Sequence, residues 1–79
     1  MDDVILKNLK VYPNPVRNIL TIKLSNQVEY NKATITNLTG KVVLKSNEKS
    51  INVHQLSEGM YLLKIDTNKG TIIKKIVKF

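Results

Sequence analysis

The sequence predicts an all-β domain, an antiparallel sandwich of about seven short strands, with a small open barrel as the alternative. Three observations lead to this class. Apolar and polar residues alternate along several short segments, which is the period of a half-buried strand. Turn residues recur about every 8 to 12 positions. No segment carries the long apolar pattern of a helix.

The composition fits one small domain that lacks covalent support. The chain has 79 residues and no cysteine, so packing and hydrogen bonds alone must hold the fold together. No run of about 20 apolar residues is present, and we expect no segment to span a bilayer. Residues 1–6 have neither a basic start nor a long apolar stretch, and we expect no secretory signal peptide there.

The charge balance bears on the partners of the domain. The net charge of +7 comes from 13 basic and 6 acidic residues, which favours solubility and is compatible with an anionic surface nearby. Arg17 is the single arginine, whereas recognition of phosphates and bases favours arginine. The three tyrosines and one phenylalanine are too scattered for a base-stacking platform. Nucleic acid is therefore not an expected partner.

The first predicted strand lies close to the N-terminus. We expect residues 1–8 to be a linker end or a short edge strand, and residues 9–79 to form the domain itself. Residues 9–12 are predicted to be extended, with Leu9 and Val11 on one side.

Two prolines follow this strand. Pro13 and Pro15 fix their own φ angles and drive Tyr12 and Asn14, the residues before them, toward extended conformations. The segment is therefore predicted to be stiff and extended. Because it lacks two backbone donors, it is also expected to lie outside the middle of a sheet.

The middle of the chain predicts further strands separated by turns. Residues 19–25 alternate cleanly, and residues 26–32 are polar and predict a loop. Residues 33–46 predict a hairpin, with Gly40 as the natural left-handed residue of its turn. Residues 50–53 predict a short strand. The side chains expected to face the core are Leu20, Ile22, Leu24, Ile51 and Val53.

The longest apolar run opens a closing hairpin over residues 60–79. Gly59 precedes this run and can take a positive φ angle that other residues resist. Strand alternation places Tyr61, Leu63 and Ile65 on the core face. The Tyr61 ring is expected in the core with its hydroxyl group at the edge.

The second half of this hairpin has a less regular pattern. The apolar residues within 71–79 have a spacing that would also suit one face of a helix. Their β-branched side chains and the turn residue Gly70 favour a strand. In a strand, Lys74 or Lys75 lies among apolar neighbours, as expected at a sheet edge.

No group of residues points to catalysis, a cofactor or a metal. His54 is the only histidine and is expected to be a solvated loop residue, because a base needs an orienting partner and a metal ligand needs companions. Asp2 and Asp3 face opposite sides of an extended chain and predict no calcium site. Three glycines are too few for a phosphate loop. The chain is predicted not to be an enzyme.

The order of five short motifs is more specific than any one of them. They are Val11-Tyr12-Pro13-Asn14-Pro15, Leu20-Thr21-Ile22, Gly40-Lys41-Val42-Val43, Leu56 with Gly59-Met60-Tyr61-Leu62-Leu63-Lys64-Ile65, and Lys74-Lys75-Ile76-Val77-Lys78. In this order the motifs resemble the type A C-terminal sorting domain of the type IX (Por) secretion system. The resemblance covers residues 9–79.

The resemblance implies an immunoglobulin-like sandwich of seven strands with a non-catalytic function. Such a domain ends a cargo protein that crosses the inner membrane of a Gram-negative bacterium by its own N-terminal signal. Shuttle and translocon components then recognise the folded domain in the periplasm and carry the cargo across the outer membrane. A sortase-like surface peptidase usually removes the domain, which places the cleavage in or before residues 1–8. The cargo is released, or is attached to an anionic lipopolysaccharide at the cell surface.

The resemblance also implies which residues matter. The final strand carries much of the signal, so the recognition candidates are Lys74, Lys75, Ile76, Val77, Lys78 and Phe79, with the three lysines exposed. The remaining motif residues, for which structural roles are also sufficient, are Tyr12, Pro13, Asn14, Pro15, Gly40, Leu56, Gly59 and Tyr61. The terminal phenylalanine departs from the lysine-ended tails common in the family.

Two alternatives remain at the level of the sequence. The C-terminal lysines equally suit protection of a sheet edge against aggregation. The domain as a whole could instead be an accessory sandwich module that binds carbohydrate or protein on a secreted enzyme. Carbohydrate-binding faces usually need exposed aromatic rings, and Tyr12 and Tyr30 are the rings available.

Overall fold

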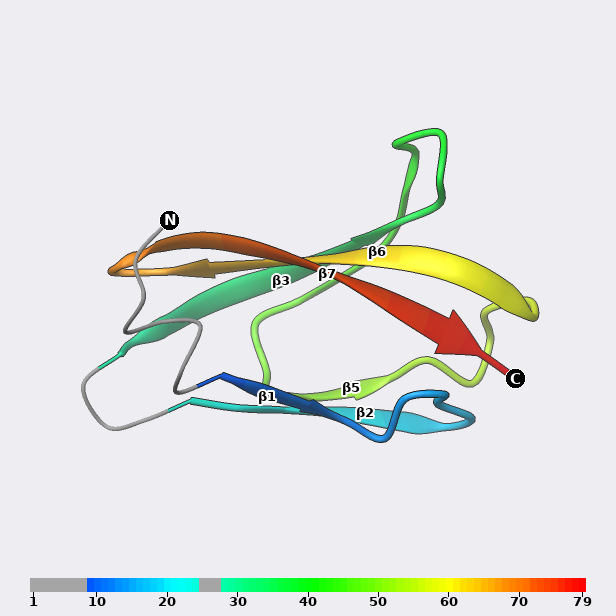
Figure 1. Cartoon of the computed structure of the whole chain (residues 1–79), viewed down its shortest axis with the longest axis horizontal. Coiled ribbons are helices and arrows are strands. Elements are labelled where there is room, and N and C mark those ends of the chain that lie inside the picture. The colour runs from blue at the N-terminus through cyan, green and yellow to red at the C-terminus, as the bar shows by residue number, and fades with distance from the viewer. Residues whose placement is uncertain (1–8, 25–27) are drawn as a thin grey trace.

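The computed structural model describes residues 9–24 and 28–79, which form seven strands and no helix (Figure 1). The strands are β1 (Lys10–Tyr12), β2 (Ile19–Lys23), β3 (Tyr30–Thr36), β4 (Val42–Ser46), β5 (Ser50–Asn52), β6 (Gly59–Thr67) and β7 (Gly70–Lys78). Within this part of the chain, no helix is long and apolar enough to cross a membrane.

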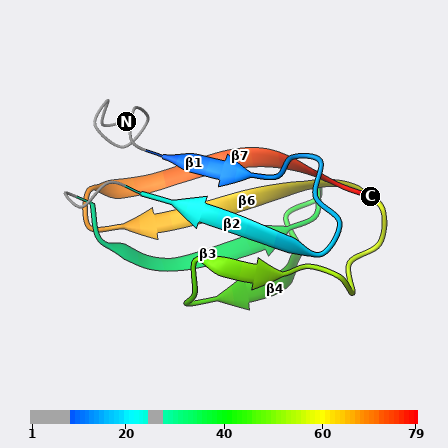
Figure 2. The ribbon, with the colours of Figure 1, turned by 90° about the horizontal axis from the view of Figure 1, so that it is seen from below.

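The strands form two antiparallel sheets that face each other (Figures 1 and 2). One sheet has three strands in the order β1-β2-β5, and the other has four in the order β4-β3-β6-β7. The prediction of an all-β, immunoglobulin-like sandwich of about seven strands is confirmed, and the open barrel is not the fold. Strand β7 lies at one edge of the four-stranded sheet.

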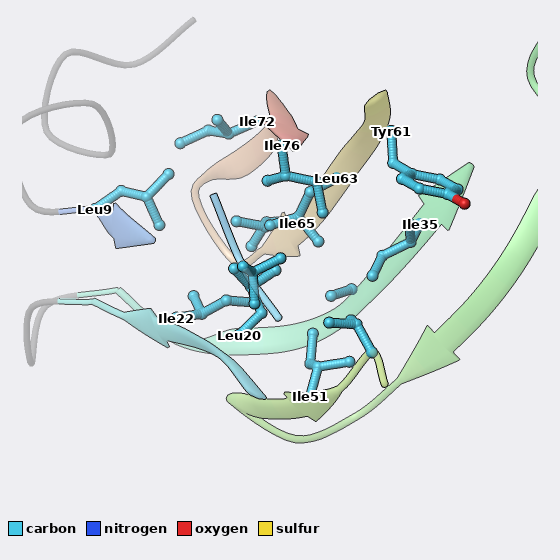
Figure 3. Close-up of a cluster of buried hydrophobic side chains, with 13 residues drawn as sticks. Leu9, Leu20, Ile22, Ile35, Ile51, Tyr61, Leu63, Ile65, Ile72 and Ile76 are labelled. Atoms are coloured by element: carbon cyan, nitrogen blue, oxygen red, sulfur yellow. The ribbon is translucent and has the colours of Figure 1, made fainter. Parts of the chain in front are cut away.

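A single apolar core fills the space between the sheets (Figure 3). Both sheets contribute side chains that are at most 1% exposed, as alternation along each strand predicts. These include Leu20, Ile22, Ile35, Leu63, Ile65, Ile72 and Ile76. Ile51 and Val53 are also buried, whereas Leu24 is half-buried and packs against the core. The predicted inward faces are therefore confirmed.

The start of β3 corrects the sequence prediction. Residues 30–32 were expected in a polar loop, but they belong to β3, because Tyr30 pairs with Thr67 of β6 and Lys32 pairs with Asp66. Pairing with β6 supplies backbone hydrogen bonds whatever the polarity of the side chains. Residues 1–8 and 25–27 lie outside the described part of the chain, so the expectation for residues 1–8 stays a prediction.

The β3–β4 turn follows its predicted chemistry. The Asn37 Oδ1 atom accepts hydrogen bonds from the backbone N–H groups of Thr39 (3.0 Å) and Lys41 (2.9 Å). Gly40 has a φ angle of 93°, in the region that disfavours side chains. The hairpin over residues 33–46 is confirmed, and its tip projects away from the sandwich (Figure 1).

The last segment is a strand along its whole length. β7 pairs antiparallel with β6 from Gly59 opposite Lys78 to Thr67 opposite Gly70. The β-branched residues of this segment therefore outweigh its helix-like spacing. Ile72 and Ile76 face the core, while Lys74 and Lys75 are exposed.

The Tyr61 ring lies in the core, and its hydroxyl group donates a hydrogen bond of 2.7 Å to the backbone carbonyl of Ser57. This confirms the predicted placement. The Tyr61→Phe variant should lower the free energy of unfolding by about 1 kcal/mol, because the partly buried carbonyl loses its donor. Urea denaturation followed by circular dichroism measures this change. A difference within the experimental error would contradict it.

Candidate functional site

The candidate site is built around the C-terminal half of β7, where a segment distant in sequence covers the strand edge. The Asn14 Nδ2 group donates a hydrogen bond of 3.2 Å to the Lys75 carbonyl. The Val77 backbone N–H donates one of 3.0 Å to Asn14 Oδ1. The carboxamide of Asn14 therefore takes the place that a neighbouring strand would occupy.

The backbone of Val16 continues this edge. Its N–H donates to the Val77 carbonyl at 2.8 Å, and its carbonyl accepts from the Phe79 N–H at 2.9 Å. Val16 forms a parallel bridge with Lys78 and is fully buried. Four hydrogen bonds thus join residues 14–16 to the outer edge of β7.

The geometry of the proline segment corrects another prediction. The peptide bonds Tyr12-Pro13 and Asn14-Pro15 are both cis, and the chain bends at Asn14 and Pro15 rather than staying extended. The bend carries the chain from β1 of one sheet to the edge of β7 in the other. The expectation that the prolines lie outside the middle of a sheet is confirmed.

The N-terminal half of the β7 edge, unlike the C-terminal half, is not covered by residues 14–16. Backbone groups of an antiparallel strand point alternately toward and away from the paired strand. Because the N–H and C=O groups of Val77 point away from β6, those of Ile73 do so too. No hydrogen bond joins the outward groups of Ile73 to residues 9–24 or 28–79. This half of the edge is therefore open within the described chain.

The recognition candidates divide into exposed and buried residues. Lys74, Lys75 and Phe79 are exposed and Val77 is half-buried. Ile76 is 1% exposed, and so its side chain belongs to the core.

The expectation that Lys78 is exposed is wrong. Lys78 is 6% exposed, because strand parity places it on the inward face with Ile76. Its aliphatic stem lies along the core, and its ammonium group donates to the carbonyl of Phe79 at the end of the sheet. Lys78 is therefore a structural residue more than a contact point.

A shallow hollow of about 590 Å³ opens beside the end of β7. Its lining residues are Arg17, Asn18, His54, Glu58, Lys78 and Phe79. The Arg17 guanidinium carbon lies 5.9 Å from the centroid of the Phe79 ring, within the range of a cation–π contact. The sequence did not predict that Arg17 and Asn18 line this hollow, because no local pattern relates them to the C-terminal residues.

His54 is exposed in the loop after β5, as predicted. Its Nδ1 atom lies 3.0 Å from the Oδ1 atom of Asn18. No serine, threonine or carboxylate is hydrogen-bonded to the ring within the described residues. No group of three potential metal ligands occurs in residues 9–24 and 28–79. Asp2 and Asp3 lie outside these residues.

The structure places the remaining motif residues in two other regions. Leu56 packs half-buried against the core, and Gly59 begins β6 with a φ angle of 147°. Gly40 lies at the tip of the β3–β4 hairpin, apart from the β7 edge (Figure 1). Of the motif residues, Asn14 is the one whose side chain forms hydrogen bonds with the final strand.

The two tyrosines of the carbohydrate-binding alternative have different environments. Tyr12 is 47% exposed. Tyr30 packs against the core, and its single O–H donor lies within hydrogen-bonding distance of the carbonyls of Glu48 (2.8 Å) and Ser46 (3.2 Å). The Tyr30 hydroxyl group thus stabilises the β4–β5 turn. Of the two tyrosines considered for carbohydrate binding, Tyr12 is therefore the one with an exposed ring.

Burial raises the pKa of Tyr30 above its ordinary value of 10.0. Since the folded state favours the neutral phenol, its contribution to stability is complete below the unfolded pKa of 10.0 and is lost as the pH rises through the folded pKa. The stability advantage of the wild type over Tyr30→Phe should therefore shrink above pH 10.0. Urea denaturation of both proteins at neutral and strongly alkaline pH measures this. An advantage independent of pH would contradict it.

Comparison of the sequence with known proteins places the chain in a family. Residues 10–79 match the family described as "Secretion system C-terminal sorting domain". The chain is 35% identical over 71 residues to beta-agarase D of Zobellia galactanivorans and 34% identical over 77 residues to ulvan lyase NLR42 of Nonlabens ulvanivorans. These matches cover 87% and 91% of the chain, but 14% of each relative. The chain thus belongs to the C-terminal sorting domains of the type IX (Por) secretion system, whose members act as sorting signals.

Proposed function

We propose that this domain directs an N-terminal cargo protein through the outer membrane by presenting a folded surface around β7 to the translocon and its shuttle components. The observation that carries the proposal is the edge position of β7, which Asn14 and Val16 cover in one half and which, within the described residues, is open at Ile73 in the other. The domain itself is non-catalytic. It meets its receptors in the periplasm and leaves with the cargo for the cell surface or the medium.

The proposed signal depends on folding and not on a linear tail. Residues 14–16 and 75–79 are about 60 positions apart in sequence, yet four hydrogen bonds join them. Ile76 is buried and unavailable to a receptor in the folded domain, and Lys78 is 6% exposed and lines the hollow beside Phe79. The exposed members, Lys74, Lys75 and Phe79, therefore form the proposed contact surface.

The open half of the β7 edge supports a specific docking mode. A receptor strand could pair with the outward N–H and C=O groups of Ile73, with backbone bonds supplying affinity and the neighbouring lysines supplying selectivity. The hollow beside Phe79 would hold a side chain of the same receptor. Removal by a sortase-like surface peptidase, with release of the cargo or its attachment to anionic lipopolysaccharide, requires a cut upstream of β1.

Fusion of residues 1–79 to a reporter with an N-terminal signal peptide tests the proposal in a host that has this secretion system. Export of the reporter across the outer membrane is expected. Retention of a folded fusion in the periplasm would contradict the function. The same fusion in a strain without the translocon is the control.

The docking mode has a separate test. Ile73→Pro removes the outward N–H group at a position that does not bond to β6, and proline is tolerated at such edge positions. Ile73→Ser is the matched control, because it removes the same side chain and keeps the N–H group. Export should fall at least about tenfold more for proline than for serine if a backbone hydrogen bond carries recognition. Equal export of the two folded variants would contradict strand pairing at this position.

A further inference from the structure

The outer face of the four-stranded sheet has an unusual mixture of side chains. The three-stranded sheet covers its inner face only (Figure 1). The apolar residues on the outer face include three that are strongly exposed: Val42 at 45%, Met60 at 44% and Ile73 at 58%. Leu62 and Val77 are half-buried on the same face.

Lysines are interleaved with these apolar side chains. The strand register places Lys64 opposite Ile73, and Lys75 opposite Leu62. On the other side of the sheet, Lys45 lies opposite Thr34, which in turn lies opposite Lys64. All three lysines are exposed. Hereafter, the outer face means the side of this sheet that carries Lys45, Lys64, Lys75 and the five apolar residues above.

Among residues 9–24 and 28–79, the strands of the outer face contribute one acidic group, and its position is peripheral. The Asp66 carboxylate accepts a hydrogen bond of 2.7 Å from the Thr71 hydroxyl near the β6–β7 turn. Lys32 of β3 lies opposite Asp66 in the register. The centre of the outer face is therefore apolar and cationic, which makes it complementary to a surface that is both apolar and anionic.

We propose that the outer face binds reversibly to an anionic lipid bilayer. Protein interfaces are enriched in aromatic residues and arginine and depleted in lysine, whereas the strands of this face carry four outward lysines, Lys32, Lys45, Lys64 and Lys75, and neither outward aromatic residues nor arginine. At a bilayer, lysine stems lie along the apolar layer while their ammonium groups reach the headgroup phosphates. The inference concerns a second property of the domain and does not rest on its proposed function.

The opposite side of the molecule provides an internal contrast. The outward residues of the three-stranded sheet include a lysine pair, Lys10 opposite Lys23, and a central row in which Thr21 lies between Ser50 and Tyr12. This face also has charge, and the exposed large apolar side chains among its described residues are Tyr12 and Ile19. Exchange of two lysines on either face changes the net charge equally, so the two faces can be compared directly.

Co-sedimentation of the 79-residue chain with vesicles tests the proposal at low salt. The probes are vesicles of phosphatidylcholine alone and vesicles of equal parts phosphatidylcholine and phosphatidylglycerol. Binding to the anionic vesicles is expected. The double variant Lys45→Gln/Lys64→Gln should bind about 25-fold more weakly, since each lysine near an anionic surface contributes about fivefold. The matched double variant Lys10→Gln/Lys23→Gln should change binding by about twofold or less, because charges far from the surface are screened.

The apolar part of the outer face has its own variant. Ile73→Ser should weaken vesicle binding about tenfold, whereas Ile19→Ser, an exposed isoleucine on the other sheet, should change it little. Equal losses from the two lysine pairs, or no loss from Ile73→Ser, would overturn the proposal, as would failure to bind anionic vesicles. Loss of a dimer in Ile73→Ser, measured by sedimentation equilibrium, would also overturn it and would assign the face to contacts between copies.

Discussion

The Leu63→Ala variant should lower the free energy of unfolding by about 3 to 5 kcal/mol. Leu63 is fully buried in β6, the strand that pairs with both β3 and β7, and it lies in the middle of the core. Truncation removes its contacts and leaves a cavity that the rigid sheet cannot close. A domain of this size has a total free energy of unfolding of about 4 to 12 kcal/mol, so the substitution removes a large part of it and can leave a substantial unfolded fraction.

Urea denaturation of the purified chain, followed by circular dichroism, measures this loss. Leu38→Ala is the matched control, because Leu38 is 60% exposed at the tip of the β3–β4 hairpin and should cost at most about 0.5 kcal/mol. A loss under about 1 kcal/mol for Leu63→Ala would show that the core is not where the structure places it. In the reporter fusion, Leu63→Ala should reduce export in proportion to the unfolded fraction.

The Asn14→Ala variant should lower the free energy of unfolding by about 1 to 2 kcal/mol. It removes both hydrogen bonds that the carboxamide makes to the β7 edge, at the Lys75 carbonyl and the Val77 N–H. Water replaces part of the loss, because the site is exposed. The Val77 N–H should also exchange with deuterium about five- to thirtyfold faster than in the wild type, as the same free energy implies.

Two further variants sharpen this test. Asn14→Asp keeps an acceptor for Val77 but places a carboxylate near the Lys75 carbonyl, and so its loss should be similar to or greater than that of Asn14→Ala. Asn47→Ala, in the exposed turn between β4 and β5, is the control and should leave the exchange of Val77 unchanged. Unchanged Val77 exchange in Asn14→Ala would show that the carboxamide does not protect the edge.

These point variants are cleaner probes than removal of the tail. A deletion of residues 74–79 would take away Ile76, which is 1% exposed, and Lys78, whose stem lies along the core. Loss of export after such a deletion would therefore mix loss of folding with loss of recognition. Ile73→Pro removes an N–H group of the open edge, Ile73→Ser removes only the side chain, and neither change touches the core.

Local pattern was sufficient to predict most of the fold. Alternation identified the buried faces of β2, β5 and β6, and turn chemistry identified the β3–β4 turn at Gly40. These features depend on neighbouring residues, and so a single sequence contains them. The start of β3 was missed, because residues 30–32 are polar and enter the sheet by pairing with β6.

The candidate site was less predictable, because it depends on contacts between distant segments. Nothing near Asn14 in the sequence indicates that its side chain bonds to Lys75 and Val77. The burial of Lys78 follows from strand parity, whereas the resemblance to the family implied that this lysine is exposed. The order of the motifs indicated that these segments belong together, whereas their contact became visible only in three dimensions.

The bond between Val16 and Phe79 has a consequence for timing. The Phe79 N–H group closes the edge onto Val16, which lies more than 60 residues earlier in the chain. This closure must wait until residue 79 has reached the compartment in which the domain folds. A machine that reads the closed edge would therefore pass over a domain in which that segment has not yet arrived.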